Sequence, residues 1–283
     1  MKLLTLFSAV AICAACANPD SSHLSSETNT KKTPRVAYVE INNYDIEAVN
    51  TYEKAGSPVF DIAIMFAANI RGKDGKADLY FNPKYEEQLT AKIGQISAVR
   101  SAGTKVLMSV LNDHQDAGWS CFRNYQDAEE FALELKKAVD TYQLDGIEID
   151  DEYDKCKRKY QDSLAMVTTA IKRVMPDKLL VKSLWSDLDY FKANYQGHTL
   201  GQNLDMGWEM TYGADCKSRA DRYLDYLDRK KLGVGASTLI DSKESARAVH
   251  QCVIDNNYGG GFMVFNLSEN NQEWLTYALS IDE

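Results

Sequence analysis

From residue 35 onward, short apolar runs alternate with amphipathic segments. Apart from residues 144–153, which carry five acids, the apolar runs carry few charges, as in parallel strands buried on both faces, and predict strands. The predicted strands are residues 35–41, 59–66, 105–110, 144–153, 179–184, 205–210, 232–236 and 261–265. The intervening segments repeat apolar residues at three- and four-residue spacing, which predicts helices. The predicted helices are residues 45–55, 84–101, 127–142, 163–175, 220–230, 244–256 and a last one from residue 272.

Strands that alternate with helices and are joined by short turns indicate an α/β fold, here a single (β/α)8 TIM barrel. The interval between the fifth and sixth strands contains Gly197 and Gly201 and no clear helical period. We therefore expect a reduced helix layer on that side. The chain has 283 residues, 45% of them hydrophobic, which suits one barrel domain over residues 34–283.

The fourth predicted strand, residues 144–153, reads L-D-G-I-E-I-D-D-E-Y. Because side chains alternate along a strand, Glu148, Asp150 and Glu152 share one face, and Ile147 and Ile149 take the other. A buried, unpaired carboxylate costs several kcal/mol, so three acids on the inward face favour a functional site. The alternative is a solvated edge strand with a charged face.

This strand resembles the D-G-x-D-x-D-x-E signature of glycoside hydrolase family 18, with Glu148 in place of the usual middle Asp. The extension from Asp150 to Tyr153 is similar to endo-β-N-acetylglucosaminidases of the endoglycosidase H and F type. Further similar segments are residues 37–43, 60–70 and 105–119. The S-x-G-G pattern of chitinases is absent after the third strand, where Ser109 precedes Val110.

Active sites of such barrels lie at the C-terminal ends of the strands, which predicts Glu152 at the mouth, Asp150 one layer down and Glu148 deeper. The resemblance implies that Glu152 is the general acid. It also implies that Asp150 orients the substrate's 2-acetamido group, which attacks the anomeric carbon, and that Tyr212 hydrogen-bonds the acetamido carbonyl. For Tyr212 the alternative is an aromatic residue at the barrel rim.

Several other residues are expected to bind substrate. If Tyr212 points inward, Trp208 does too, for sugar stacking or for packing, and Glu209 turns away. Polar residues expected in strand-exit loops could bind sugar hydroxyls. The substrate-binding candidates are Asn69, His114, Gln115, Glu148, Trp208 and Asn266.

The N-terminus has the pattern of a targeting segment. Lys2 precedes an apolar run up to Ala15, too short for a permanent membrane span. The following Cys16 sits in a box similar to those of bacterial lipoproteins, so we expect residues 1–16 to be a signal segment and Cys16 to be lipidated. Cleavage by an ordinary signal peptidase is the alternative. Residues 17–33 are polar and predict a flexible tether, in a protein anchored to the bacterial cell envelope or secreted.

The formal net charge of -9 and the absence of a basic cluster argue against a nucleic-acid partner. The cysteine spacing fits no zinc pattern and only four His are present, so no metal or other cofactor is expected. A monomer is expected.

Cys121, Cys156, Cys216 and Cys252 lie beyond the leader and allow three pairings, among which the sequence alone does not choose. Because exit loops of adjacent parallel strands emerge side by side, we predict a Cys121–Cys156 disulfide, with two free thiols as the alternative. Its loop of about 35 residues would contribute on the order of 3 kcal/mol.

Taken with the resemblance, these residues predict a hydrolase that cuts between the two core N-acetylglucosamines of N-linked glycans with retention of configuration. One alternative is a chitinase or chitobiosidase with the same catalytic strand. Another is a glycan-binding barrel without turnover. The variable loops decide which glycan type is preferred, and the sequence does not specify it.

Overall fold

The computed structural model describes residues 33–54, 56–73, 76–268 and 271–282. The predicted signal segment, the lipidation site Cys16 and all of the tether except residue 33 lie outside these ranges. Within the described residues, none of the helices combines the length and the apolar character needed to span a membrane.

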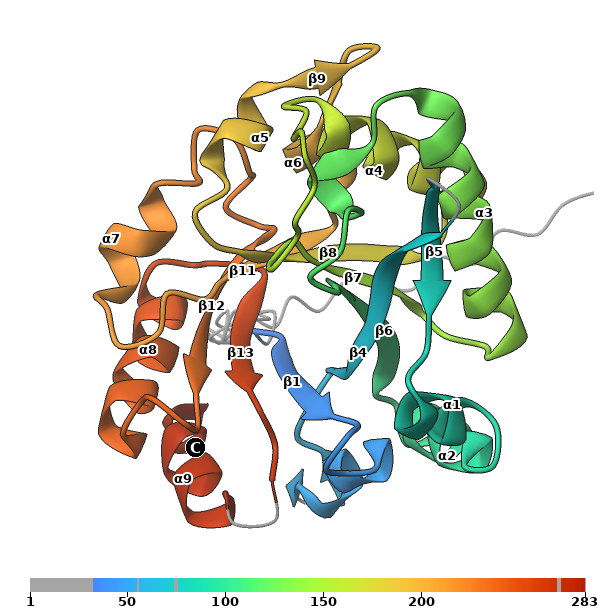
Figure 1. Ribbon diagram of the computed structural model, residues 1–283. Helices are drawn as coiled ribbons and strands as arrows, with labels where there is room; N and C mark the ends of the chain where they lie inside the picture. The colour runs from blue at the N-terminus through green and yellow to red at the C-terminus, as the bar shows by residue number, and fades with distance from the viewer. Residues whose placement is uncertain (1–32, 55, 74–75, 269–270, 283) are drawn as a thin grey trace, which may run out of the picture. The chain divides into compact units, whose positions relative to one another are not determined.

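The described residues form a closed barrel of eight parallel strands, which confirms the predicted fold (Figure 1). Each strand pairs with the next along the chain, and the last pairs with the first. In chain order the strands are β1 (Arg35–Glu40), β4 (Ile62–Lys73), β6 (Lys105–Asn112), β7 (Gly146–Asp150), β8 (Leu179–Leu184), β11 (Met206–Glu209), β12 (Leu232–Ser237) and β13 (Gly261–Phe265). Alternate side chains fill the barrel interior, Tyr38, Ile64 and Trp208 among them, while the others pack under the helices.

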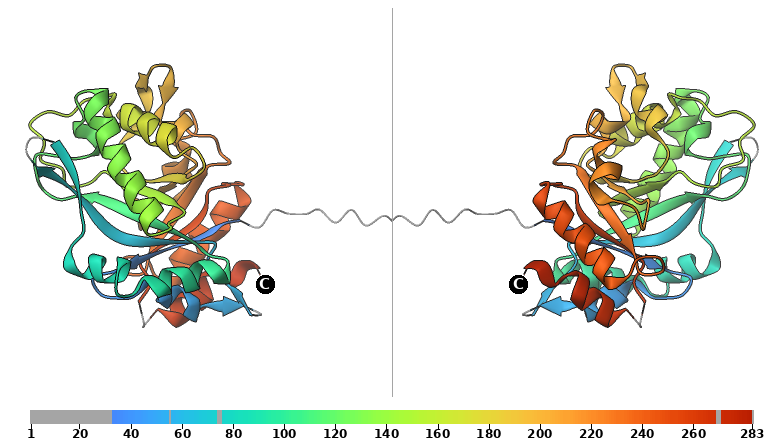
Figure 2. Two further views of the ribbon diagram at one scale, coloured as in Figure 1. Left: turned by 90° about the vertical axis from the view of Figure 1, so that its right-hand side faces the viewer. Right: turned by 90° about the vertical axis from the view of Figure 1, so that its left-hand side faces the viewer.

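Helices surround the strands, as Figure 1 shows. They are α1 (Pro83–Leu89), α2 (Ile93–Ala102), α3 (Tyr125–Thr141), α4 (Ser163–Val174), α5 (Leu188–Lys192), α6 (Leu200–Asn203), α7 (Cys216–Asp221), α8 (Lys243–Asp255) and α9 (Gln272–Ala278). Short 3-10 helices are η1 (Ile46–Thr51), η2 (Trp119–Cys121) and η3 (Ser280–Asp282). The outer layer between β8 and β11 holds only α5, α6 and a small hairpin of β9 (Asn194–Tyr195) and β10 (His198–Thr199), so it is reduced as expected. Figure 2 shows this hairpin projecting from the barrel.

The helix predicted over residues 45–55 is wrong. The segment forms η1 and a two-stranded hairpin, β2 (Glu53–Lys54) with β3 (Ser57–Pro58). Asp45 occupies the N-cap position of η1, but its side chain makes no capping hydrogen bond, because its carboxylate accepts hydrogen bonds from Lys92 Nζ at 2.7 Å and Gln95 Nε2 at 3.1 Å. Residues distant in the sequence therefore bind the side chain that the local sequence pattern assigned to a helix cap.

The single helix predicted over residues 84–101 is divided into α1 and α2. Thr90 Oγ1 bonds back to the carbonyl of Glu86 at 2.7 Å, and the Gln88 side chain donates to the carbonyl of Lys92 at 3.3 Å. Such local side-chain bonds compete with the helical backbone pattern. Gly103, with φ +110°, ends α2 where the sequence predicted.

Strand β4 runs further than predicted and turns back as a hairpin with β5 (Lys76–Tyr80). Asn69, expected in an exit loop, lies inside this hairpin opposite Tyr80. The helix predicted over residues 220–230 instead begins at Cys216 and ends at Asp221. In both places the predicted boundaries of the element were misplaced.

Candidate active site

The start of β7 is fixed by Asp145 and Gly146. Asp145 Oδ2 accepts hydrogen bonds from Arg100 Nε and from the backbone N–H of Val106, both at 2.9 Å. A Cβ built on Gly146 would lie 2.1 Å from the carbonyl oxygen of Leu179, so only glycine allows β7 to approach β8 this closely. The D-G pair of the sequence motif thus sets the register of the acidic strand.

Glu148 lies at the bottom of the site and is fully buried. Its Oε1 accepts hydrogen bonds from the N–H and the hydroxyl of Ser183 at 2.9 and 2.8 Å, and Ser183 Oγ lies 3.0 Å from the Tyr38 hydroxyl. Burial raises the pKa of the Glu148 carboxyl, although the Ser183 hydrogen bonds oppose this. Glu148 is not among the residues that line the cleft described below, and its role in substrate binding stays a prediction.

Asp150 lies one layer higher and is 4% exposed. Its Oδ1 is buried and has no hydrogen-bond partner among the described residues. Burial, together with the charges of Glu148 and Glu152, raises the pKa of Asp150 well above its usual value. Asp150 also lines the cleft, so its carboxyl group lies where a bound substrate can contact it.

Glu152 follows the end of β7 and is partly exposed at the mouth. Burial raises the pKa of this carboxyl, the charges of Glu148 and Asp151 add to the rise, and Lys182 opposes it. A raised pKa suits a group that must hold a proton near neutral pH. Lys182 itself is 2% exposed and pairs with Asp187 at 2.7 Å, so a fixed cation lies close to the acidic strand.

The acids open into a cleft of ≈ 490 Å³ at the C-terminal ends of the strands. Its lining is mostly aromatic and apolar. The lining residues are Tyr38, Phe66, Leu111, Asp150, Glu152, Tyr153, Ser183, Trp185, Met210, Thr211, Tyr212, Ile240 and Phe265. Among these described residues Asp150 and Glu152 are the only carboxylates, and both come from one strand end. The cleft therefore places no second carboxylate opposite Glu152.

Tyr212 enters the cleft with its ring stacked near Phe265, at a centroid distance of 6.2 Å. Burial raises the pKa of its hydroxyl well above the usual value, and the charges of Asp150 and Glu152 add to the rise. The hydroxyl is thus protonated over the whole range in which a glycosidase works, and is able to donate a hydrogen bond.

Trp208 was expected either to stack on a sugar or to pack inside the barrel. Its side chain is fully buried inside the barrel, and Nε1 donates to the carbonyl of Gly260 at 2.8 Å. The inward direction of Trp208 was expected from the alternation with Tyr212, but it places the indole below the cleft. Its burial favours packing, and a role in sugar binding stays a prediction.

The polar loop candidates do not line the cleft. Asn266 is 5% exposed and donates to Glu40 Oε2 at 3.0 Å, and Asn69 donates to the carbonyl of Leu111 at 3.3 Å. Gln115 Oε1 accepts from the N–H of Gly72 at 3.2 Å. Each of these three side chains thus connects two segments of the barrel by a hydrogen bond.

His114 is exposed, and its ring lies 5.0 Å from that of Tyr153, a cleft residue.

Two exposed aromatics that were not predicted as site residues line the cleft, Tyr153 at 54% and Trp185 at 49% exposed. Trp185 directly follows a predicted strand, so its position was a usable signal for a rim residue.

The structure joins the four cysteines in two disulfides. Cys121 and Cys156 are bonded with Cα atoms 6.0 Å apart, and Cys216 and Cys252 with Cα atoms 6.5 Å apart. Asp154 lies beside the first pair, but both sulfur atoms are used in the disulfide, so the three residues do not form a metal-ligand set.

The sequence model of the glycosyl hydrolases family 18 matches residues 34–222, which include the whole of β7 and the Tyr212 turn. The chain belongs to glycosyl hydrolases family 18. Two curated relatives are similar to this family member over most of its length. An endo-beta-N-acetylglucosaminidase of Flavobacterium sp. (strain SK1022) is 33% identical over 254 residues, covering 86% of this chain and 78% of the relative. Endo-beta-N-acetylglucosaminidase F1 of Elizabethkingia meningoseptica is 26% identical over 280 residues, covering 93% of this chain and 80% of the relative.

A solved structure with the same fold is Bacteroides thetaiotamicron EndoBT-3987 with a Man5GlcNAc product. The TM-score is 0.72 at 23% identity, with 86% of this chain aligned. This family 18 chain spans 57% of the length of that structure.

Proposed function

We propose that this family 18 protein is an endo-β-N-acetylglucosaminidase that hydrolyses the β-1,4 bond of the N,N'-diacetylchitobiose core of N-linked glycans. The observation that carries the proposal is the placing of Asp150 and Glu152 at one strand end, with no carboxylate opposite them among the described cleft residues. An ordinary retaining glycosidase needs an opposed nucleophile, whereas a substrate-assisted enzyme takes it from the substrate's own acetamido group. The two curated relatives carry the same activity in their names.

In the first step Glu152 donates its proton to the glycosidic oxygen as the bond from that oxygen to the anomeric carbon breaks. The acetamido oxygen attacks the same carbon and forms an oxazolinium ion. Asp150, which lines the cleft, accepts a hydrogen bond from the acetamido N–H and stabilises the positive charge on that nitrogen. Tyr212 donates a hydrogen bond to the acetamido oxygen and orients it.

In the second step the Glu152 carboxylate removes a proton from water, which attacks the anomeric carbon from the face that the leaving group vacated, while the bond from that carbon to the acetamido oxygen breaks and restores the acetamido group. Two inversions at one carbon retain its configuration. The buried neighbours Glu148 and Asp150 assist both steps. The charge of Glu148 raises the pKa of Asp150, and the positive charge of the oxazolinium ion offsets this repulsion.

The test is incubation of the protein with glycoproteins that carry defined high-mannose, hybrid and complex N-glycans, followed by mass measurement of both products. We expect a protein that retains one N-acetylglucosamine and a free glycan that ends in the other, with Glu152→Gln as the inactive control. Cleavage of chitin oligosaccharides without cleavage of any glycoprotein would favour a chitinase. Binding of glycans without products would favour a non-catalytic barrel.

We propose further that the protein acts as a monomer fixed to the cell envelope by a lipid on Cys16. The apolar run before Cys16 and the polar residues after it support this proposal. The mass of the mature N-terminal peptide tests it. A diacylglycerol-bearing Cys16 is expected, and an unmodified N-terminus at another residue would indicate ordinary signal-peptide cleavage.

A further inference from the structure

Tyr212 lies in a tight turn after β11, and the peptide groups on both sides of it are held by buried charges. The turn is closed by its own N–H, which donates to the carbonyl of Met210 at 2.8 Å, and Gly213 follows with φ +75°. Such a short turn has few internal contacts of its own. The direction of the Tyr212 ring therefore depends on what holds the neighbouring peptides.

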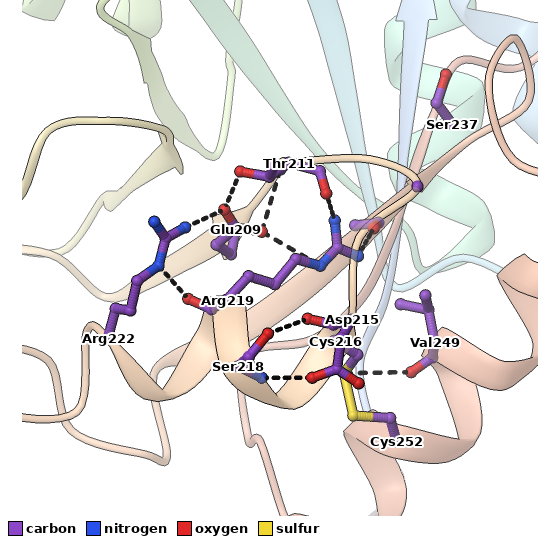
Figure 3. Close-up of polar contacts among 12 residues, drawn as sticks. Glu209, Thr211, Asp215, Cys216, Ser218, Arg219, Arg222, Ser237, Val249 and Cys252 are labelled. Atoms are coloured by element: carbon purple, nitrogen blue, oxygen red, sulfur yellow. Dashed lines mark hydrogen bonds and ion pairs between the residues drawn. A yellow bond between two sulfur atoms is a disulfide. The ribbon is translucent and has the colours of Figure 1, made fainter.

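Arg219 holds the peptide before Tyr212. It lies on α7, is 3% exposed, and donates from one guanidinium nitrogen to the carbonyl of Thr211 and from the other to the carbonyl of Gly235 at 2.7 Å (Figure 3). Its Nε lies 3.3 Å from Glu209 Oε2. The planar fork thus joins the Tyr212 turn to strand β12, which a point charge on a lysine would do less well.

Asp241 holds the peptide after Tyr212. It is 6% exposed, and its two oxygens accept from the N–H of Gly213 at 3.0 Å and of Ser237 at 2.8 Å. A buried cation therefore binds the carbonyl on one side of Tyr212, and a buried anion binds the N–H on the other side. Neither side chain is among the described residues that line the cleft.

Glu209 and a disulfide fix the two residues in place. Glu209 is fully buried on the outer face of β11 and accepts hydrogen bonds from the N–H of Thr211 at 3.0 Å and from Arg222 at 3.2 Å. The Cys216–Cys252 disulfide ties α7, which carries Arg219, to α8, which begins just after Asp241 (Figure 3).

A buried ion network of this size is weak evidence for stability, because the desolvation of charges offsets much of their attraction. Its contacts converge instead on the backbone of one cleft residue. We infer that Arg219 and Asp241 are positioning residues that fix the Tyr212 hydroxyl at the place where the substrate's acetamido oxygen binds. The inference rests on the proposed function of Tyr212.

The experiment compares Arg219→Lys with Arg222→Lys. Arg222 also bonds Glu209 but contacts neither peptide group of Tyr212, so it is the matched control. We expect Arg219→Lys to lower kcat on a cleaved N-glycoprotein about tenfold or more, since misplacing a contact group by about 1 Å costs up to about 100-fold. KM should change much less, and Arg222→Lys should stay close to the wild type.

The same substitution in a Tyr212→Phe background separates positioning from a general structural effect. If Arg219 acts through the Tyr212 hydroxyl, its loss should add little to the effect of Tyr212→Phe. Full additivity of the two losses, or equal losses in Arg219→Lys and Arg222→Lys, would overturn the inference. If Arg219→Lys does not fold, Asp241→Asn takes its place, because it leaves one of the two N–H groups without an acceptor.

Amide hydrogen exchange over residues 208–215 provides a readout that does not need turnover. Exchange should be faster in Arg219→Lys or Asp241→Asn and unchanged in Arg222→Lys, and unchanged exchange in all three would contradict the inference. If the wild type cleaves no glycan, the proposed function fails while the exchange data still decide whether these residues hold the turn. If the wild type cleaves and Tyr212→Phe is impaired but Arg219→Lys is not, only the positioning role fails.

Discussion

Replacing Asp150 with Asn should make the protein more stable and much less active. Asp150 is buried on the same strand face as Glu148, and burial and the neighbouring carboxylates raise its pKa. Residues two apart on a strand are separated by about 6.6 Å, and two unit charges at that distance repel by about 2.5 kcal/mol at an effective dielectric constant of about 20. The attraction of Lys182 offsets part of this, so we expect a net gain of about 2 kcal/mol, or a Tm higher by about 4–8 °C at neutral pH.

The pH dependence of this gain has a defined sign. The pKa of such a carboxyl is higher in the folded protein than its unfolded value of about 3.9. The carboxyl therefore lowers the free energy of unfolding as the pH rises from the unfolded pKa to the folded pKa, and it has no such effect at pH values below the unfolded pKa. The difference in Tm between Asp150→Asn and the wild type should therefore be large at pH 7 and vanish near pH 3.5. Asp45→Asn is the control of opposite sign, because Lys92 lowers the pKa of Asp45 and its loss should reduce Tm at pH 7.

The activity of Asp150→Asn should fall about 10²- to 10³-fold on a glycoprotein, since one electrostatic partner of the developing charge is lost. A preformed sugar oxazoline should be affected less, because its ring is already closed. Thermal unfolding followed by circular dichroism and product analysis by mass spectrometry measure the two effects. A variant less stable than the wild type at pH 7, or equal losses on both substrates, would refute this reasoning.

Four further outcomes are expected. Glu152→Gln keeps the fold and glycan binding but lowers the rate about 10²- to 10⁴-fold through loss of the proton donor, as steady-state turnover will show. Lys182→Met raises the pKa of Glu152 and moves the alkaline limb of the pH–rate profile to higher pH; an unmoved limb would mean that Lys182 does not act on the acid. Trp208→Ala lowers the unfolding free energy by about 3–5 kcal/mol in denaturant titration and leaves KM nearly unchanged, whereas a large rise in KM would restore a role in binding. Double replacement of Cys121 and Cys156 by Ser lowers stability by about 2–4 kcal/mol, and peptide mapping of the unreduced wild type must show the linked pair.

Local pattern was enough to place the acidic strand and to orient it. The alternation of Ile147 and Ile149 with Glu148 and Asp150 is a property of any strand, and the structure buries all four of these residues as that alternation requires. The turn Asp145–Gly146 likewise follows from local chemistry. These features involve residues close in sequence, so no knowledge of distant partners was needed.

The partners of single polar side chains were not evident from the sequence. Asn69, Gln115 and Asn266 were assigned to substrate because polar residues after strands often bind ligands, yet each one bonds a group of a neighbouring segment. A side chain of this kind is equally suited to a sugar hydroxyl and to a backbone amide. Only the arrangement of strands around the barrel decides which partner lies within hydrogen-bonding distance.

The sequence by itself determined the barrel, the order of its strands and the inward direction of Glu148, Asp150 and Trp208, because these follow from the period of apolar residues. Tertiary structure decided how deep each side chain lies. Trp208 and Glu148 point into the barrel as predicted, but both are fully buried below the cleft. Arg219 and Asp241 lie on different segments and both bind the backbone of the Tyr212 turn. Depth and convergence depend on strand stagger and on loop packing between distant segments, and no local pattern of polar and apolar residues encodes them.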